Sequence, residues 1–120
     1  MTLADLLKEY SERPDYQALE TGCHDVHTKD AFGNPPISVA AVRGHADEIV
    51  LLLNAGADID AKGEHGYTAL HEAVEQGHFD IVKLLIERGA NGTIKNDFGD
   101  TAAEHAEIMG EKQILTLLTI

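Results

Sequence analysis

Basic residues, cysteine and aromatic residues are all scarce in this 120-residue chain. Nine Lys and Arg stand against 21 Asp and Glu, so the formal net charge is −12. Nucleic acid and anionic membranes are poor partners for such a chain, because both would be repelled, whereas a basic protein would be attracted. The lone cysteine, Cys23, cannot form an internal disulfide, which fits a reducing compartment.

Long apolar runs are also missing. No stretch approaches the roughly 20 apolar residues that cross a bilayer. The first ten residues carry acids within their apolar face and no basic leader, so they do not fit a signal peptide. We therefore expect a cytoplasmic protein with no membrane partner.

A fixed spacing of 33 residues relates markers along the chain. The residues that follow it are Gly33, Gly66 and Gly99, then Gly44, Gly77 and Gly110, then Ala40, Ala73 and Ala106, and the pairs Gly56-Ala57 and Gly89-Ala90. Between the markers lie short amphipathic segments that stop at glycine, as residues 68–76 and 79–88 do. Apolar residues three and four apart, followed by glycine, predict two helices in each interval.

The middle interval resembles the ankyrin repeat, whose units have 33 residues and two helices. Thr68-Ala-Leu-His71-Glu-Ala73 matches the family motif Thr-Pro-Leu-His-x-Ala, with Ala69 in place of proline. The resemblance implies an all-α solenoid of helix–turn–helix units with short β-hairpin loops. It also implies four parts, which are a degenerate N-terminal capping helix pair (1–29), two repeats (30–62 and 63–95) and a C-terminal capping repeat (96–120).

The first repeat departs from the family pattern at the start of its first helix. Pro35 and Ser38 stand where Thr and His are usual. We therefore expect the polar link between Thr and His to be absent from this unit. Pro35 also lacks a backbone N–H, so this helix start must be bonded differently.

Local signals predict several helix ends. Thr2 with Asp5, and Thr101 with Glu104, have the spacing of capping boxes. At the N-terminal end, a second helix is expected from Pro14 through Ala18 and Leu19 to a stop at Gly22.

Seven histidines invite a metal or catalytic interpretation. His71 lies in the repeat motif and is expected to bond to backbone and to the neighbouring Thr, whereas His45 and His78 are expected to serve turns. His105 is expected to be exposed. We therefore predict no catalytic residue and no cofactor.

Cys23-His24-Asp25-Val26-His27 is the local cluster with metal-ligand chemistry. Zinc sites usually draw four ligands from two separated pairs, and no second pair accompanies this one. No metal is therefore predicted. A metal-binding or enzymatic site centred on Cys23, His24 and His27 stays open as an alternative.

The resemblance implies that partners contact the hairpin tips and the groove ends of the first helices. Phe32, Tyr67 and Phe98 are expected to form a row of exposed rings among acids, where rings supply packing and carboxylates supply steering. Packing of Phe32 and Phe98 against adjacent hairpins is the alternative. The predicted partner-binding residues are Phe32, Asn34, Arg43, Glu64, His65, Tyr67, Glu75, Gln76, Asp97, Phe98, Asp100 and Met109.

These features predict a non-enzymatic protein-binding module that is monomeric alone. A small acidic protein of this kind looks like the inhibitor or immunity-type ankyrin proteins that bacteria pair with toxic enzymes. It would block a basic, nucleic-acid-processing enzyme by offering carboxylates where that enzyme expects phosphates. A scaffold or adaptor with several weaker partners and little salt dependence is the alternative.

Overall fold

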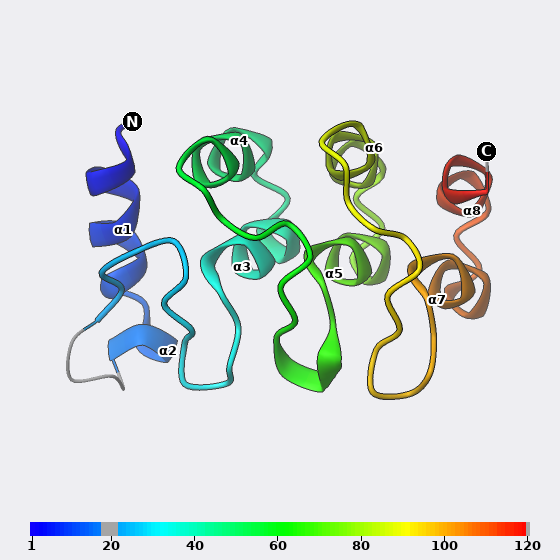
Figure 1. Cartoon of the computed structure of the whole chain (residues 1–120), viewed down its shortest axis with the longest axis horizontal. Helices are drawn as coiled ribbons and strands as arrows, with labels where there is room; N and C mark the ends of the chain where they lie inside the picture. Colours follow the sequence, from blue (N-terminus) through cyan, green and yellow to red (C-terminus); the bar gives the residue numbers. More distant parts are fainter. Residues whose placement is uncertain (18–21, 120) are drawn as a thin grey trace.

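The computed structural model describes residues 1–17 and 22–119, which form α-helices and one short 3-10 turn. The helices recur in pairs, which are α3 with α4, α5 with α6 and α7 with α8, and these pairs stack side by side (Figure 1). The all-α solenoid predicted from the sequence is therefore confirmed. The elements are α1 (Leu3–Ser11), α2 (Pro14–Gln17), α3 (Pro36–Arg43), α4 (Ala46–Asn54), η1 (Glu64–Gly66), α5 (Ala69–Glu75), α6 (Phe79–Glu87), α7 (Ala102–Met109) and α8 (Lys112–Leu118).

The main contacts join neighbours along the stack. Helix α3 packs on α4 and α5, and α5 in turn packs on α6 and α7. At the N-terminal end α1 contacts α2 and α4. The result is an elongated body of 40 × 27 × 19 Å, in which the hairpin loops project from the row formed by α3, α5 and α7 (Figure 1).

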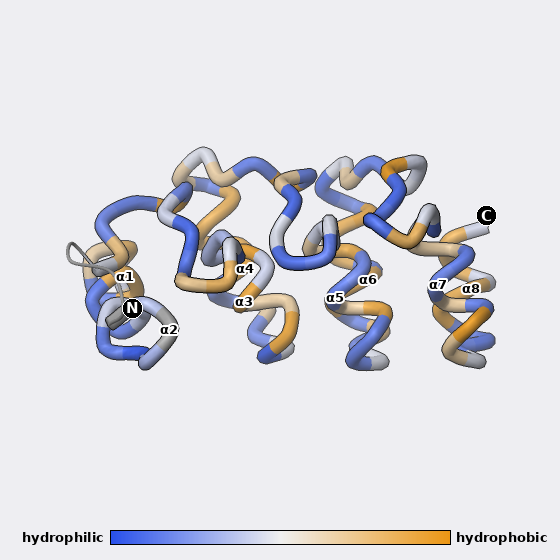
Figure 2. The backbone as a smooth tube through the Cα atoms, turned by 90° about the horizontal axis from the view of Figure 1, so that it is seen from below, coloured by the Kyte–Doolittle hydropathy of each residue, from blue (hydrophilic) through white to orange (hydrophobic). Residues whose placement is uncertain are grey.

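The core runs through the stack as one continuous apolar layer. Ala40, Ala73 and Ala106 are fully buried in the first helix of each pair, and their small side chains let these helices approach closely. The second helices contribute larger groups, such as Leu52 and Leu85. Figure 2 shows that hydrophobic positions concentrate in the helices and that the loops are mostly hydrophilic.

Gly44 shows how successive units fit together. It ends α3 in the left-handed region (φ 73°), which glycine adopts without steric cost. A Cβ atom there would lie 3.0 Å from the ring of His78, which belongs to the next unit. The His78 Nε2–H donates to the Val42 carbonyl at 3.1 Å, so His78 serves the turn of the preceding unit, whereas the sequence predicted a role in the turn that follows Gly77.

The hairpin loops are tight turns, and no strand is assigned in the described ranges. In the first hairpin, the Asp30 carboxylate accepts from the backbone N–H groups of Phe32 and Asn34, each at 2.9 Å. The Asn96 side chain binds the last hairpin in the same way. The described loops therefore form the tight turns of hairpins, but they lack the paired β-strands that the family resemblance implied.

Two predicted helix caps are confirmed. The Thr2 hydroxyl accepts from the Asp5 N–H at 3.1 Å, and the Asp5 carboxylate accepts in return from the Thr2 N–H. Thr101 and Glu104 make the same reciprocal pair at the start of α7. Such caps satisfy backbone donors that a helix leaves unpaired at its first turn.

The second helix is shorter in its described part than predicted. Helix α2 begins at Pro14 as expected and extends to Gln17, whereas Ala18 and Leu19 lie outside the described residues. None of the described helices has the length and apolar character needed to cross a bilayer.

Candidate functional site

Three residues in the same repeat register form the outer row of the hairpin tips, namely Phe32, His65 and Phe98. Phe32 is 62% exposed and Phe98 is 66% exposed, which agrees with the predicted exposed rings at these two positions. His65 lies between them in the register, and its ring centroid is 5.9 Å from that of Phe98. We call these three residues the tip row.

Tyr67 is not part of the tip row, so the predicted exposure of its ring is wrong. It is only 8% exposed, because its ring packs between two imidazoles from α5 and α7. The centroid distances are 5.5 Å to His71 and 5.3 Å to His105. Burial raises the pKa of the Tyr67 hydroxyl, and acids including Glu75 add to the effect. Its predicted contact with a partner stays a prediction, for a residue that exposes little surface.

The acids of the tips remain exposed, and the backbone near them joins one hairpin to the next. Asn34 Oδ1 accepts from the Glu64 N–H at 2.9 Å, and the Asp97 N–H donates to the His65 carbonyl at 2.9 Å. The side chains of Glu64 and Asp97 stay in solvent. Asn34 is therefore a half-buried connector between hairpins, while the two acids flank the tip row.

Asp100 also serves the link between units through its backbone. Its carbonyl accepts from His71 Nε2–H at 2.8 Å, while His71 Nδ1 accepts from the Thr68 hydroxyl at 2.9 Å. The predicted structural role of His71 is confirmed. Burial lowers the pKa of His71, which keeps the imidazole neutral at neutral pH and suited to this pair of bonds.

His105 is buried at 7% exposure, so the expectation of an exposed imidazole is wrong. It fills space beside Tyr67, and its Nε2 lies 3.9 Å from Glu75 Oε1 without a hydrogen bond. Glu75 is thus positioned on the α7 side of its helix. Of the remaining predicted groove residues, Gln76 and Met109 are exposed.

Arg43 is engaged by the N-terminal end of the stack. Its guanidinium lies 3.3 Å from Glu9 and 3.2 Å from the buried Glu48. Glu48 also accepts from the Tyr10 hydroxyl at 2.8 Å. These contacts hold α1 against α3 and α4, so Arg43 has a structural role in addition to its predicted contact with a partner.

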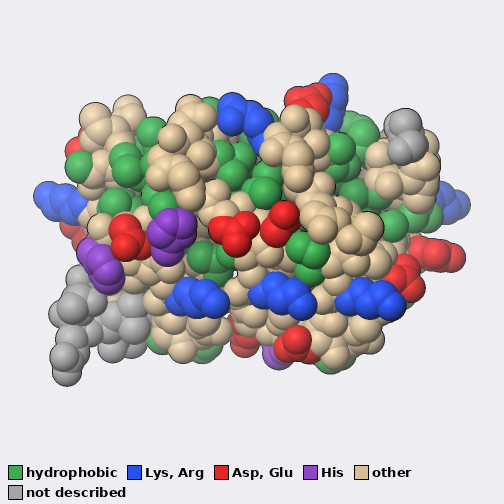
Figure 3. All heavy atoms as spheres, viewed as in Figure 1, with side chains coloured by type: hydrophobic (Ala, Val, Ile, Leu, Met, Phe, Trp, Pro, Cys, Tyr) green, Lys and Arg blue, Asp and Glu red, His purple; other side chains and the backbone are tan. Residues whose placement is uncertain are grey.

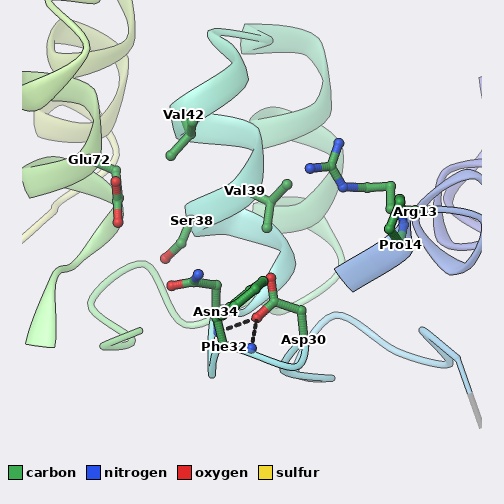
Figure 4. Close-up of a pocket in the computed structure, with 9 residues that line it drawn as sticks. All are labelled: Arg13, Pro14, Asp30, Phe32, Asn34, Ser38, Val39, Val42 and Glu72. Atoms are coloured by element: carbon green, nitrogen blue, oxygen red, sulfur yellow. Dashed lines mark hydrogen bonds between the residues drawn. The ribbon is translucent and has the colours of Figure 1, made fainter. Parts of the chain in front are cut away.

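A hollow of about 430 Å³ lies over α3, between the N-terminal helices and α5 (Figure 4). Its apolar lining includes Phe32, Val39 and Val42, and its polar lining includes Ser38 and Glu72. We call it the α3–α5 hollow. Figure 4 shows Ser38 and Glu72 on the same side of α3, with Arg13 at the opposite end.

Two of the polar groups that line the hollow, Ser38 and Glu72, are unusual. Ser38 is 1% exposed, and its hydroxyl has no hydrogen-bond partner in the described part of the chain. Burial, with the carboxylates of Glu75 and Glu64 nearby, raises the pKa of Glu72 to about 7. The sequence signalled this place through the departure at Pro35 and Ser38, but Glu72 was not among the predicted site residues.

The charge of the surface is not uniformly negative. Lys29, Lys62 and Lys95 share one register position and are all exposed. Figure 3 shows a row of basic side chains along one face, with acids above and below it. The acidic excess is therefore interrupted on this face by the lysine row.

The Cys23 cluster does not gather around a common point. The Cys23 thiol is buried, and burial together with the Asp25 carboxylate raises its pKa to about 11. His24 and His27 are exposed. Among the described residues, no group of three or more His, Cys, Asp or Glu side chains is arranged to hold a metal ion. Cys23 is a core residue here, because it is 4% exposed and packs in the apolar core, and its raised pKa disfavours the thiolate that attacks substrates or binds metal.

Comparison with known families identifies the repeats. The model described as ankyrin repeats (3 copies) matches residues 5–96. No curated protein matches the chain.

Proposed function

The chain belongs to the ankyrin repeat family, whose repeats are non-enzymatic protein-binding modules, and we propose that it binds and inhibits a basic partner protein. In this proposal the chain is a monomer that acts in the cytoplasm. Its partner is a toxin-like or nucleic-acid-processing enzyme, which the chain neutralises in the manner of an immunity protein.

The tip row and its acids carry the proposal. Phe32 and Phe98 expose large rings at equivalent positions of two hairpins. The exposed carboxylate of Glu64 belongs to the hairpin of His65, and that of Asp97 belongs to the hairpin of Phe98. Exposed aromatic groups serve as anchors in protein interfaces, and charged groups around them steer and orient the partner. The net charge of −12 favours a basic partner over any anionic one.

Inhibition follows from the same charges. An enzyme that processes nucleic acid carries basic residues where phosphates bind. Carboxylates presented by a rigid surface can occupy those basic residues and exclude the substrate. Because the attraction is electrostatic, binding should weaken as salt screens it.

Capture of the partner from the source cell tests the proposal, with the immobilised 120-residue chain and a salt series. We expect recovery of one basic protein whose activity falls when the chain is added. Recovery of several proteins with little salt dependence would instead indicate an adaptor. Recovery of no basic protein at physiological salt would overturn the proposal.

A variant of the tip row tests the surface. Phe98→Ala should weaken binding of the captured partner by at least about tenfold, because an anchor ring typically contributes more than 1 kcal/mol. Titration by calorimetry measures the loss, and circular dichroism should show unchanged helix content. Phe79→Ala, which removes a partly exposed ring from α6, is the matched control and should leave binding unchanged. If Phe79→Ala weakens binding and Phe98→Ala does not, the tip row is not the interface.

A further inference from the structure

We propose that the α3–α5 hollow is a subsite for an arginine side chain of the partner, with the guanidinium held by Glu72 and Ser38. This inference rests on the proposed function, because it assigns one contact of the same bound partner. It concerns a place in the groove that is separate in character from the exposed tip row.

A short side chain, Ser38, lines the hollow at a register position that the next unit fills with a larger one. In the middle unit His71 reaches across to the next unit and donates to the Asp100 carbonyl at 2.8 Å. Ser38 occupies the same register position in the preceding unit, but its hydroxyl is too short to make that bridge. The space that an imidazole fills beside α5 is therefore left open beside α3, with a buried hydroxyl facing it.

A buried hydroxyl without a partner points to a missing ligand. Leaving such a group unsatisfied costs about 1–3 kcal/mol, so native structures usually pair it. Ser38 is 1% exposed and has no partner in the described ranges. A donor brought by a bound molecule would satisfy its oxygen.

The carboxylate of Glu72 defines the charge of that ligand. Across residues 1–17 and 22–119, no ion pair joins Glu72 to a basic side chain, and the charges that act on it are the carboxylates of Glu75 and Glu64. A second acid or a neutral group would not relieve this repulsion. A cation would, because it pairs with the ionised carboxylate in a partly dehydrated place.

Shape favours arginine over lysine. The guanidinium is a planar fork that can bind a carboxylate with two N–H groups and still donate to a neighbouring hydroxyl. Its aliphatic stem and flat head also pack well on apolar and aromatic walls, which Val39, Val42 and Phe32 provide.

The two ends of the hollow determine the direction of the bound side chain. Figure 4 places Arg13 at the end away from Glu72. The carboxylate of Asp30 also lines the hollow, and it accepts from the backbone N–H groups of Phe32 and Asn34. A bound guanidinium that pairs with Glu72 therefore has its head between α3 and α5.

Capped tripeptides test the subsite without knowledge of the partner. The probes are alanine–arginine–alanine, the same peptide with citrulline, which is a neutral isostere of arginine, and the same peptide with lysine. Nuclear magnetic resonance titration of the full chain at about pH 8, where Glu72 is mostly ionised, gives both affinity and location. We expect the arginine peptide to shift signals of Ser38, Val42 and Glu72, with the citrulline peptide at least about tenfold weaker and the lysine peptide between them.

Matched variants complete the test. Glu72→Gln keeps the side-chain shape and should weaken the arginine peptide by about tenfold, whereas Glu107→Gln on the exposed side of α7 should not change it. Ser38→Ala should weaken it less, by a few fold. Equal binding of the arginine and citrulline peptides, or signal changes that avoid the hollow, would overturn the inference.

The outcomes separate this inference from the proposed function. If a basic partner is captured but the arginine peptide does not bind the hollow, the subsite is wrong and the protein-binding role stands. If the peptide binds the hollow but no basic partner is recovered, the subsite stands and the inhibitor role is wrong.

Discussion

Ser38 and His71 occupy equivalent positions in successive units but have opposite consequences. The His71 imidazole joins two units through Thr68 and Asp100. Ser38 leaves its unit without that link and leaves the hollow open. The absence of the Thr–His link was predictable from the sequence, because the motif position is local. The hollow was not, because it also needs Glu72 from the neighbouring unit.

Glu72 makes the stability of the protein depend on pH in a defined direction. Its pKa is about 7 in the folded chain and 4.5 by its ordinary value, so the folded state holds the proton more tightly. Stability is therefore expected to fall as pH rises from about 4.5 to 7, because the unfolded chain releases this proton first. Glu72→Gln should remove that loss and stabilise the protein by about 1–2 kcal/mol above pH 7, a value reduced from the full shift because water still reaches the side chain.

Urea unfolding followed by circular dichroism at pH 5 and pH 8 measures this effect. The gain from Glu72→Gln should appear at the higher pH and largely disappear at the lower one. Glu107→Gln, at an exposed position, should follow the unmodified chain at both. A gain that is the same at both pH values would contradict the raised pKa.

Tyr67 and His105 show where residue-level prediction failed. Both were expected to be exposed, and both are buried because each fills space beside the other. That contact joins α7 to the hairpin before α5, across 38 residues of sequence, so no local pattern reports it. The register did hold a clue, since Tyr67 aligns with Asn34 and Asp100, which are both half-buried, rather than with Phe32 and Phe98.

At the scale of the helices, sequence patterns were most informative where their causes are local. Glycine stops, apolar spacing and capping pairs predicted the helix pairs, and α6 is described at Phe79–Glu87 against an expected 79–88. The attachment of α1 was not predicted, because it depends on Tyr10, Glu48 and Arg43, which come from three helices. Side chains that meet across distant segments give no periodic signal.

The buried face of α6 provides a prediction at this scale. Leu85 is fully buried, so Leu85→Ala should lower the free energy of unfolding by about 2–5 kcal/mol through lost burial and the cavity left behind. Lys83→Ala on the exposed face of the same helix should change it by less than about 0.5 kcal/mol. Urea unfolding of both variants measures the difference, and equal effects would mean that α6 does not pack as described.

For the whole molecule, the repeat register predicted the architecture because the same small residues are buried at equivalent positions of successive units. The location of the hollow and the burial of His105 lay beyond it, since they depend on where units differ. The acidic excess was visible from composition, whereas its distribution around the lysine row required the folded arrangement. Composition is therefore the basis of the partner class that we propose, and the differences between units are the basis of the subsite that we propose for it.

The stack also predicts an uneven stability along its length. Each unit gains its main contacts from its neighbours, so the middle unit is supported on both sides and the end units on one. Native-state hydrogen exchange should therefore be slowest in α5 and α6 and fastest in α1 and α8. Exchange at one common rate throughout the core would show instead that the chain opens as a single cooperative body.

The tip row has a mechanical consequence for such a chain. Phe32, His65 and Phe98 belong to three successive hairpins, whereas each repeat unit packs mainly against the adjacent units. A protein that binds all three of these residues bridges more than one interface between units and therefore stabilises the stack. Binding of this partner then raises the free energy needed to unfold the end units. The increase grows with the logarithm of the ratio of the partner concentration to the dissociation constant. Proteases that attack the opened ends would thus spare the chain in its complex, and the lifetime of the protein in the cell would depend on how much of its target is present.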